Sequence, residues 1–303
     1  MGVDVTLHSI VQSLISGILT GMVYALVGCG LNIILGVMNV INMSHGEFIM
    51  LFAFTNFFLY FFLNINPLAS LFFLIPISFL AGVLTYYLTI PRLLKSENPQ
   101  LSSYIVYYGL SLVISSAALF IFGERTRGVP FPFGVTSLKL LGFTIPVGRL
   151  VAAIVSLIAN LMLMIFLYRT YLGKATRATI QSRDSSMLLG IDVGKISVIS
   201  FGIGILATGI AGGLIPIMYP AINPYMGFGY TLIAWACIVL GGLGNPVGGI
   251  IGGLIYGIAE TLAGILLPTS FSPLIAFLII IVVVALKPEG LLGEKKRRMQ
   301  LRV

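Results

Sequence analysis

Nine apolar runs, bounded by charged residues, Pro or Gly, constrain this sequence more than any other feature. They cover residues 10–35, 46–63, 68–90, 104–122, 147–168, 196–216, 228–243, 247–266 and 271–286. A helix needs about 20 apolar residues to cross a bilayer, and most of these runs approach that length. Only 9% of the residues are charged, against about 25% in a soluble domain. The sequence therefore predicts an all-α polytopic integral membrane protein with about 8–10 transmembrane helices.

The basic residues orient these spans. Thirteen of the 17 Lys and Arg residues fall in three segments, 92–103, 169–195 and the tail from 287. Cytoplasmic loops of membrane proteins are enriched in Lys and Arg, so we expect these segments inside and 123–149 outside. With nine spans, the C-terminus is then cytoplasmic and the N-terminus external. This topology also explains the net charge of +8, so no nucleic-acid partner is expected.

A weak internal echo suggests that the chain has two related halves. The stretches "INMSHGEF" (41–48) and "INPYMGFG" (222–229) align at an offset of 181, which makes Asn223 and Gly227 the counterparts of Asn42 and Gly46. Five spans separate the two copies, and an odd number reverses direction in the membrane. Such inverted repeats with interrupted helices often hold a transport path near the bilayer midplane. We expect one membrane domain, 1–303, with halves of about 10–168 and 196–286, a cytoplasmic loop 169–195 and a basic tail 287–303.

The segment "GVMNVINMSHGEFIM" (36–50) contains the first dense cluster of polar residues. Polar atoms are costly in apolar surroundings unless they are paired or wetted. Two interpretations are open: a plain loop between helices, or an interrupted helix whose polar groups line a cavity. The candidate residues are Asn39, Asn42, His45, Gly46 and Glu47.

We favour a helix break over 36–47, beside a translocation path. Asn39 and Asn42 are expected to satisfy backbone groups that the break leaves free. Gly46 is expected to allow close approach of the next helix. His45 and Glu47 are expected to hydrogen-bond across the junction, as structural switches and not as catalysts.

No motif for catalysis or metal binding is present. His45-Gly46-Glu47 has the H-x-E spacing of zinc deaminases, but no P-C-x-x-C follows. H-E-x-x-H, G-x-S-x-G and the phosphate-binding G-x-x-x-x-G-K-[ST] are absent from the sequence. We therefore predict a protein that is not an enzyme and carries no metal or cofactor. If it pumps, its ATPase is another chain.

The second cluster is "GGLGNPVGGIIGGLIYGIAE" (241–260). Asn245 lies in a turn signal and is a candidate for a helix break beside the path. Gly249, Gly253 and Gly257 recur every fourth residue, which predicts a small helix face suited to tight packing. Glu260 ends this stretch. Its carboxyl is expected to be hydrogen-bonded within the protein, with substrate contact as the alternative.

The third cluster is "GKATRATIQSRDSSMLLGIDVGKI" (173–196). Residues 175–189 lack Pro and Gly, and Gly190 ends the run. We expect one short amphipathic helix there, either lying at the membrane surface or docked in a groove of another protein.

Together these segments resemble the permeases of branched-chain amino-acid ABC importers, the LivH type. The resemblance rests on "GLNIILGVMNVINMSHGEFIM", "INPYMGFG" and "VLGGLGNPVGGIIGGLIYGIAE", in that order along the chain. It implies four kinds of partner: a second, LivM-like permease subunit, two cytoplasmic ATP-binding subunits, an external substrate-binding protein and the lipid bilayer. It also implies a multi-pass protein of the cell inner membrane. Leucine, isoleucine and valine are the expected substrates, with urea or short amides as alternatives.

The resemblance also implies a cytoplasmic coupling loop that binds the ATPase. The stretch Asp184-Ser185-Ser186-x-x-x-Gly190 is similar to the Glu-Ala-Ala-x-x-x-Gly pattern of such loops but departs from it at three positions. The candidate coupling residues are Arg177, Arg183, Asp184, Ser185, Ser186, Met187, Leu188 and Gly190.

Other transport mechanisms remain open. An ion-coupled secondary transporter of small amino acids or amides would use intramembrane acids, and Glu47 and Glu260 could serve. It would need no ATPase, so transport by this chain alone would distinguish it.

Overall fold

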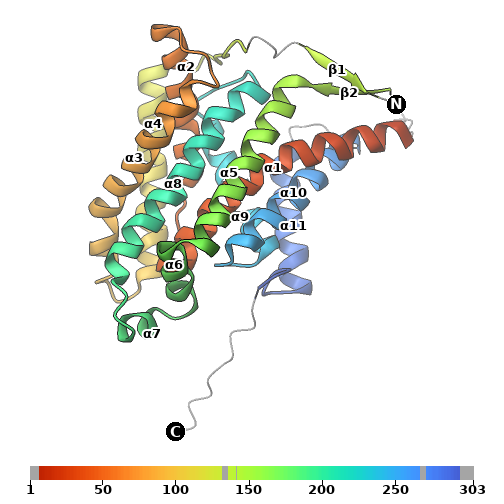
Figure 1. Cartoon of the computed structure of the whole chain (residues 1–303). Helices are drawn as coiled ribbons and strands as arrows, with labels where there is room; N and C mark the ends of the chain where they lie inside the picture. The colour runs from red at the N-terminus through yellow and green to blue at the C-terminus, as the bar shows by residue number, and fades with distance from the viewer. Residues whose placement is uncertain (1–6, 132–135, 141, 267–270, 294–303) are drawn as a thin grey trace.

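The computed structural model describes residues 7–131, 136–140, 142–266 and 271–293 as a helical bundle with one short hairpin (Figure 1). The helices along the bundle are α1 (Leu7–Met38), α2 (His45–Leu63), α3 (Ser70–Leu93), α4 (Pro99–Phe122), α5 (Val147–Arg169), α8 (Val193–Met218), α9 (Met226–Gly241), α10 (Pro246–Leu266) and α11 (Ser272–Leu286). Two short helices, α6 (Tyr171–Gln181) and α7 (Arg183–Leu188), lie at one end. The strands β1 (Ser137–Leu140) and β2 (Phe143–Pro146) lie at the other.

The prediction of an all-α polytopic membrane protein is confirmed. Each of the nine apolar runs coincides with a helix whose ends differ from the expected ones by a few residues. Seven of the described helices are long and apolar enough to cross a membrane: α1 to α5, α8 and α10. Helix α9 is apolar but has only 16 residues, and α11 has 15.

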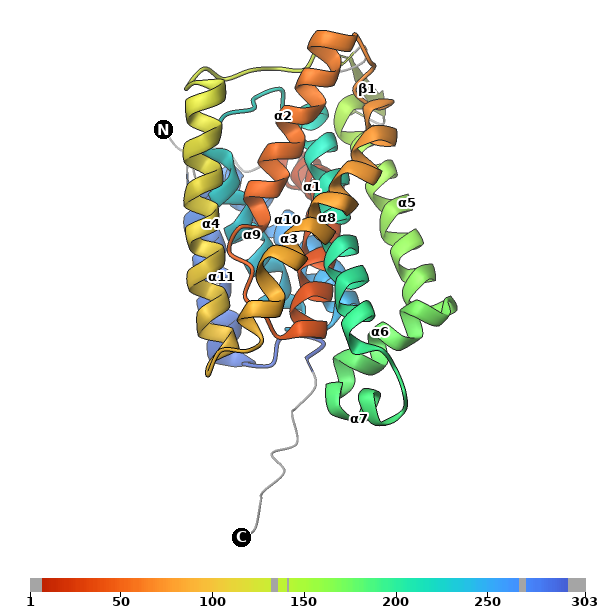
Figure 2. The same cartoon turned by 90° about the vertical axis from the view of Figure 1, so that its left-hand side faces the viewer.

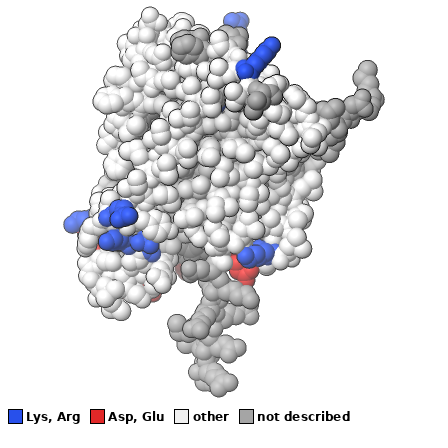
Figure 3. Space-filling view, turned by 45° about the vertical axis from the view of Figure 1, so that its right-hand side comes forward, with Lys and Arg blue, Asp and Glu red and all other residues white. Residues whose placement is uncertain are grey.

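On the face that Figure 3 shows, the charged side chains lie towards the two ends of the bundle, and the surface between them is uncharged. One end, hereafter the basic end, carries α6, α7 and the loop between α3 and α4. The opposite end, hereafter the hairpin end, carries β1 and β2. Segments 92–103 and 169–195 thus share one end. Lys287 directly follows α11; five of the six basic residues expected in the tail lie outside the described residues.

The hairpin was not predicted. β1 and β2 pair antiparallel with Leu140 opposite Phe143. The first turns of α1 hold this hairpin: the His8 ring stacks on Phe143, and the Gln12 side-chain amide donates to the Thr144 carbonyl at 2.6 Å.

Helices α1 and α10 are packed through glycines, as the spacing of Gly249, Gly253 and Gly257 predicts. A Cβ on Gly253 would collide with the backbone of Ala25, and one on Gly257 with the backbone of Gly21. Small residues allow such approach between membrane helices.

Helices α3 and α8 form a second pair of this kind. A Cβ on Gly202 would meet the Phe79 ring, one on Gly82 the Gly202 backbone, and one on Gly209 the Ser78 side chain. The first helix of each half thus packs on the third helix of the other half: α1 on α10, and α8 on α3.

The expected break at 36–47 is wrong in extent. Helix α1 continues to Met38, and α2 begins at His45, so the non-helical segment is 39–44. The series of backbone hydrogen bonds of α1 continues to Asn39, whose N–H donates to the Leu35 carbonyl at 2.8 Å. Asn39 itself has a φ of 55°, a left-handed conformation that Asn adopts more readily than most residues and that ends the helix.

The expected single helix over 175–189 is also wrong. The structure has two helices, α6 and α7, separated at Ser182, whose backbone is extended. The Ser182 hydroxyl accepts the Ser185 N–H at 3.2 Å and so caps α7. Serine competes for backbone hydrogen bonds inside helices and is favoured at their N-termini, which explains the break.

Candidate functional site

The candidate site is the place where the first turns of α2 and α9 meet, beside the middle of α4 (Figure 2). Ser111, the thirteenth of the 24 residues of α4, donates to the Glu47 carboxylate at 3.1 Å. One turn further on, the Ser115 hydroxyl donates to the carbonyl of Pro224, which precedes α9. Helix α4 is long enough to cross a membrane, and these serines lie near the middle of that candidate span. The segments 39–44 and 219–225 therefore bring two helix N-termini into the interior.

Gly46 and Gly227 form the contact between the two helices. A Cβ on Gly46 would collide with the Gly227 carbonyl and the Thr231 N–H. The Gly46 N–H donates to the Thr231 hydroxyl at 2.9 Å. Gly46 was expected to allow close approach of the next helix; the helix that approaches it is α9, which is far along the chain.

Asn42 and Asn223 play the same structural part before their helices. The Asn42 side-chain oxygen accepts the Ser44 N–H at 3.0 Å, and that of Asn223 accepts the Tyr225 N–H, also at 3.0 Å. Each forms a local turn in which a side chain replaces a backbone acceptor. The helices that follow begin 181 residues apart, at His45 and Met226, which matches the predicted echo.

Glu47 is 1% exposed. One carboxylate oxygen, Oε1, accepts the Ser111 hydroxyl, and the other, Oε2, has no hydrogen-bond partner. Oε2 lies against the Cα of Gly227, where a side chain at that position would strike it. The described residues place no Lys or Arg in an ion pair with this acid.

His45 and Asn39 lie to either side of this junction. The His45 ring Nε2 is 3.2 Å from the Val27 carbonyl of α1, and its Nδ1 has no partner. His45 thus bonds to α1 and not to α9. The Asn39 side chain is exposed, and this residue ends α1 through its backbone conformation. Asn42 instead uses its side chain, which accepts the Ser44 N–H.

A polar seam on α4 was missed. Ser103, Tyr107, Ser111 and Ser115 recur every fourth residue and form one stripe. Ser103 accepts the Ile41 N–H at 3.0 Å, and the Tyr107 hydroxyl lies 2.7 Å from that of Thr89. With Ser111 and Ser115, these hydroxyls attach α4 to the bundle. The fourfold spacing in the sequence could have revealed the stripe.

Asn32 was also missed. It is fully buried in α1, and its side-chain amide donates to the carbonyls of Gly242 and Asn245 at 3.1 and 2.7 Å. Its oxygen accepts the Gly244 N–H at 2.8 Å. Asn245, predicted near the path, instead shapes this turn at the basic end, where its own side chain accepts the Gly248 N–H.

Glu260 sits on α10 within electrostatic range of Tyr24, Tyr230 and Tyr256. Glu47 instead lies between α2, α4 and α9, against Ser111 and Gly227.

The candidate coupling residues divide between α6 and α7. Arg177 is used within the chain: its Nε donates to the Leu167 carbonyl at 3.1 Å, and its guanidinium lies 4.2 Å from the centre of the Tyr168 ring. On α7, Met187 and Leu188 are exposed, at 51% and 88%, together with Leu189. Asp184 and Ser185 are exposed on the same short helix.

Ser186 and Gly190 complete the α7 turn. Ser186 is buried, and its carbonyl accepts the Ile191 N–H. Gly190 has a φ of 78°, a conformation that suits glycine. The following Asp192 caps α8 by accepting the Lys195 N–H. This hydrogen bond, and to a smaller extent the one from the Lys195 amine, holds the pKa of the Asp192 carboxyl below its ordinary value.

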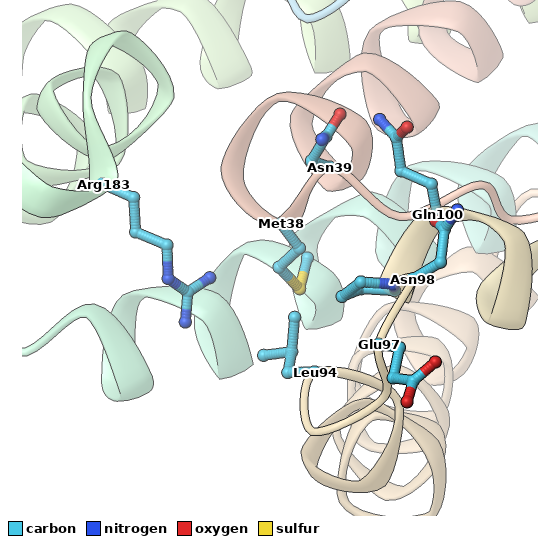
Figure 4. A pocket seen from close by; sticks show the side chains of 8 residues that line it. Met38, Asn39, Leu94, Glu97, Asn98, Gln100 and Arg183 are labelled. Atoms are coloured by element: carbon cyan, nitrogen blue, oxygen red, sulfur yellow. The ribbon is translucent and has the colours of Figure 1, made fainter.

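An open pocket of about 400 Å³ lies at the basic end between α1, α7 and the α3–α4 loop (Figure 4). Arg183 approaches it from α7, while Glu97 and Gln100 lie on the other side of Met38 and Leu94. Arg183 and Asn39 are thus brought to one surface, away from Glu47.

Comparisons with known proteins agree on one family. A family model described as "Branched-chain amino acid transport system / permease component" matches residues 13–284. The high-affinity branched-chain amino acid transport system permease protein LivH of Salmonella typhimurium is 29% identical over 293 residues, covering 93% of this chain and 95% of that protein. The corresponding protein BraD of Pseudomonas aeruginosa is 28% identical over 301 residues, covering 95% and 97%.

A more distant relative carries the name of the second permease type. The probable branched-chain amino acid transport permease protein LivM of Methanocaldococcus jannaschii is 26% identical over 249 residues, covering 76% of this chain and 71% of that protein. No solved structure matches the chain.

Proposed function

Because the chain belongs to the family of branched-chain amino acid transport permeases, we propose that it forms the membrane path of an ABC importer for leucine, isoleucine and valine. The observation that carries this proposal is the match over residues 13–284, together with seven described helices able to span a membrane. The relatives LivH and BraD are named for the same transport.

The path runs past the junction of α2 and α9. Irregular backbone at membrane depth is tolerated where it is buried in protein or faces a water-filled cavity. Two such segments, 39–44 and 219–225, lead into the first turns of α2 and α9, which meet there, and Asn42 and Asn223 satisfy the backbone of these segments. The equivalent turns and the crossed pairs α1–α10 and α3–α8 support two halves related as inverted repeats.

The permease works with separate partners. The sequence contains no phosphate-binding G-x-x-x-x-G-K-[ST], so ATP hydrolysis belongs to two cytoplasmic subunits and the permease is not an enzyme. A LivM-like subunit completes the membrane part, in keeping with the relative of that name, and an external binding protein supplies substrate. The basic end faces the cytoplasm of a cell inner membrane, which also places the C-terminus inside.

Reconstitution tests this function. The permease, its LivM-like partner, the ATPases and the binding protein in liposomes should accumulate radiolabelled leucine only when ATP is present. Accumulation by this chain alone, driven by a proton or sodium gradient, would instead establish the ion-coupled alternative.

A further inference from the structure

The Glu47 side chain points in a direction that its position in α2 does not explain. It is the third residue of the helix, where a Glu side chain can turn back to the N-terminal backbone. Instead it points away, towards Ser111 of α4 and Gly227 of α9. Its carboxylate therefore serves the space between helices and not the start of its own helix.

This carboxylate has unused capacity. An ionised carboxylate has about four acceptor sites, and Glu47 uses one of them, for the Ser111 hydroxyl, while Oε2 has no partner although the residue is buried. A buried acid without a basic partner is costly. The adjoining N-termini of α2 and α9 carry positive partial charge, which favours a negative group at this position.

The helices around Glu47 carry apolar residues within one turn of the junction. Met50 lies one turn along α2, Ile114 one turn along α4, and Met226 at the start of α9, and all three belong to one packed cluster. A negative group beside such a cluster matches a molecule with an ammonium group next to a branched apolar tail.

We infer that Glu47 is the residue of the translocation path that binds the α-ammonium group of the substrate, in exchange for the Ser111 hydroxyl. An ammonium has three donors, which fit the acceptor sites that Glu47 leaves unused. The Ser111 hydroxyl is one neutral donor, and an ammonium that displaces it offers the carboxylate charged donors instead. This inference rests on the proposed function, because it takes the substrate to be a zwitterionic amino acid.

Three variants in the assembled importer test it. Glu47→Gln keeps the shape and an acceptor for Ser111 but removes the charge, Glu47→Asp keeps the charge, and Ser111→Ala removes only the hydrogen bond. ATP-driven leucine uptake and ATP hydrolysis stimulated by the loaded binding protein are measured for each.

Glu47→Gln should lower leucine uptake about tenfold or more, with stimulated ATP hydrolysis within about twofold of the unmodified complex. Glu47→Asp should recover a substantial part of the uptake. Ser111→Ala should lower uptake by about two- to fivefold, less than Glu47→Gln, because it removes one neutral hydrogen bond and keeps the charge.

Normal uptake by Glu47→Gln, or an equal loss in Ser111→Ala, would overturn the inference. So would failure of Glu47→Gln to assemble, since only a structural need for the charge would explain it. Absence of leucine uptake by the unmodified complex would instead refute the proposed function.

Discussion

At the scale of single residues, the junction depends on the absence of side chains at Gly46 and Gly227. Backbone atoms of α9 occupy the space that a Cβ on Gly46 would need, and backbone cannot rotate away as a long side chain can. Gly46→Ala should therefore separate the two helices and lower the free energy of unfolding by about 1–3 kcal/mol. Gly109→Ala is the matched control, because a Cβ there meets nothing within 4 Å. Equal thermal stability of the two purified variants would contradict the close contact.

The same scale shows what the sequence could and could not predict. Asn42, Gly46 and Asn223 were identified because polar residues and glycines stand out in apolar runs. Asn32 stands out equally, but its partners lie about 210 residues away, at Gly242 and Asn245, and no local pattern indicates such a contact. Glu260 was grouped with Glu47 by charge alone, and only tertiary packing shows that their surroundings differ.

At the scale of secondary-structure elements, the α7 helix presents an apolar surface at the basic end. Met187 and Leu188 would each contribute about 1.5–3 kcal/mol if an ATPase subunit covered them fully. The double variant Met187→Asp, Leu188→Asp should detach the ATPase or uncouple transport from ATP hydrolysis, while the permease still inserts. Co-purification and leucine uptake measure the two effects. Exchanging the residues, Met187→Leu with Leu188→Met, keeps the apolar area and should leave both intact.

Element boundaries followed the sequence where a single strong signal decided them. The nine described helices along the bundle follow from long apolar runs, because burial of backbone polar groups in lipid leaves helices as the available form. The sequence did not predict the boundary between α6 and α7, because Ser182 is tolerated inside a helix and only the structure shows that it caps α7. The hairpin failed because residues 137–146 obtain their partners from α1.

At the scale of the whole molecule, the distribution of charge predicts orientation. Ser137 on β1 and Gln181 at the end of α6 are both exposed and lie at opposite ends of the bundle. With a membrane-impermeant maleimide, Ser137→Cys should be labelled in intact cells, and Gln181→Cys should be labelled only after the membrane is permeabilised. Background labelling should be low, because Cys29 and Cys237 are both buried. Labelling of both from outside would reject the orientation.

The glycine packing of α1 on α10 has a mechanical consequence. Where Gly257 meets Gly21 and Gly253 meets Ala25, backbone touches backbone, so neither helix can slide or roll without separating. The pairs α1–α10 and α3–α8 are therefore each expected to move as a single rigid unit. Helix α4 is expected to move more easily than these pairs, because its hydroxyl groups can exchange one hydrogen-bond partner for another. Helix α7 contacts α6 and α8, so a movement imposed on α7 passes first to α8 and, through the glycine contacts, to α3 with it.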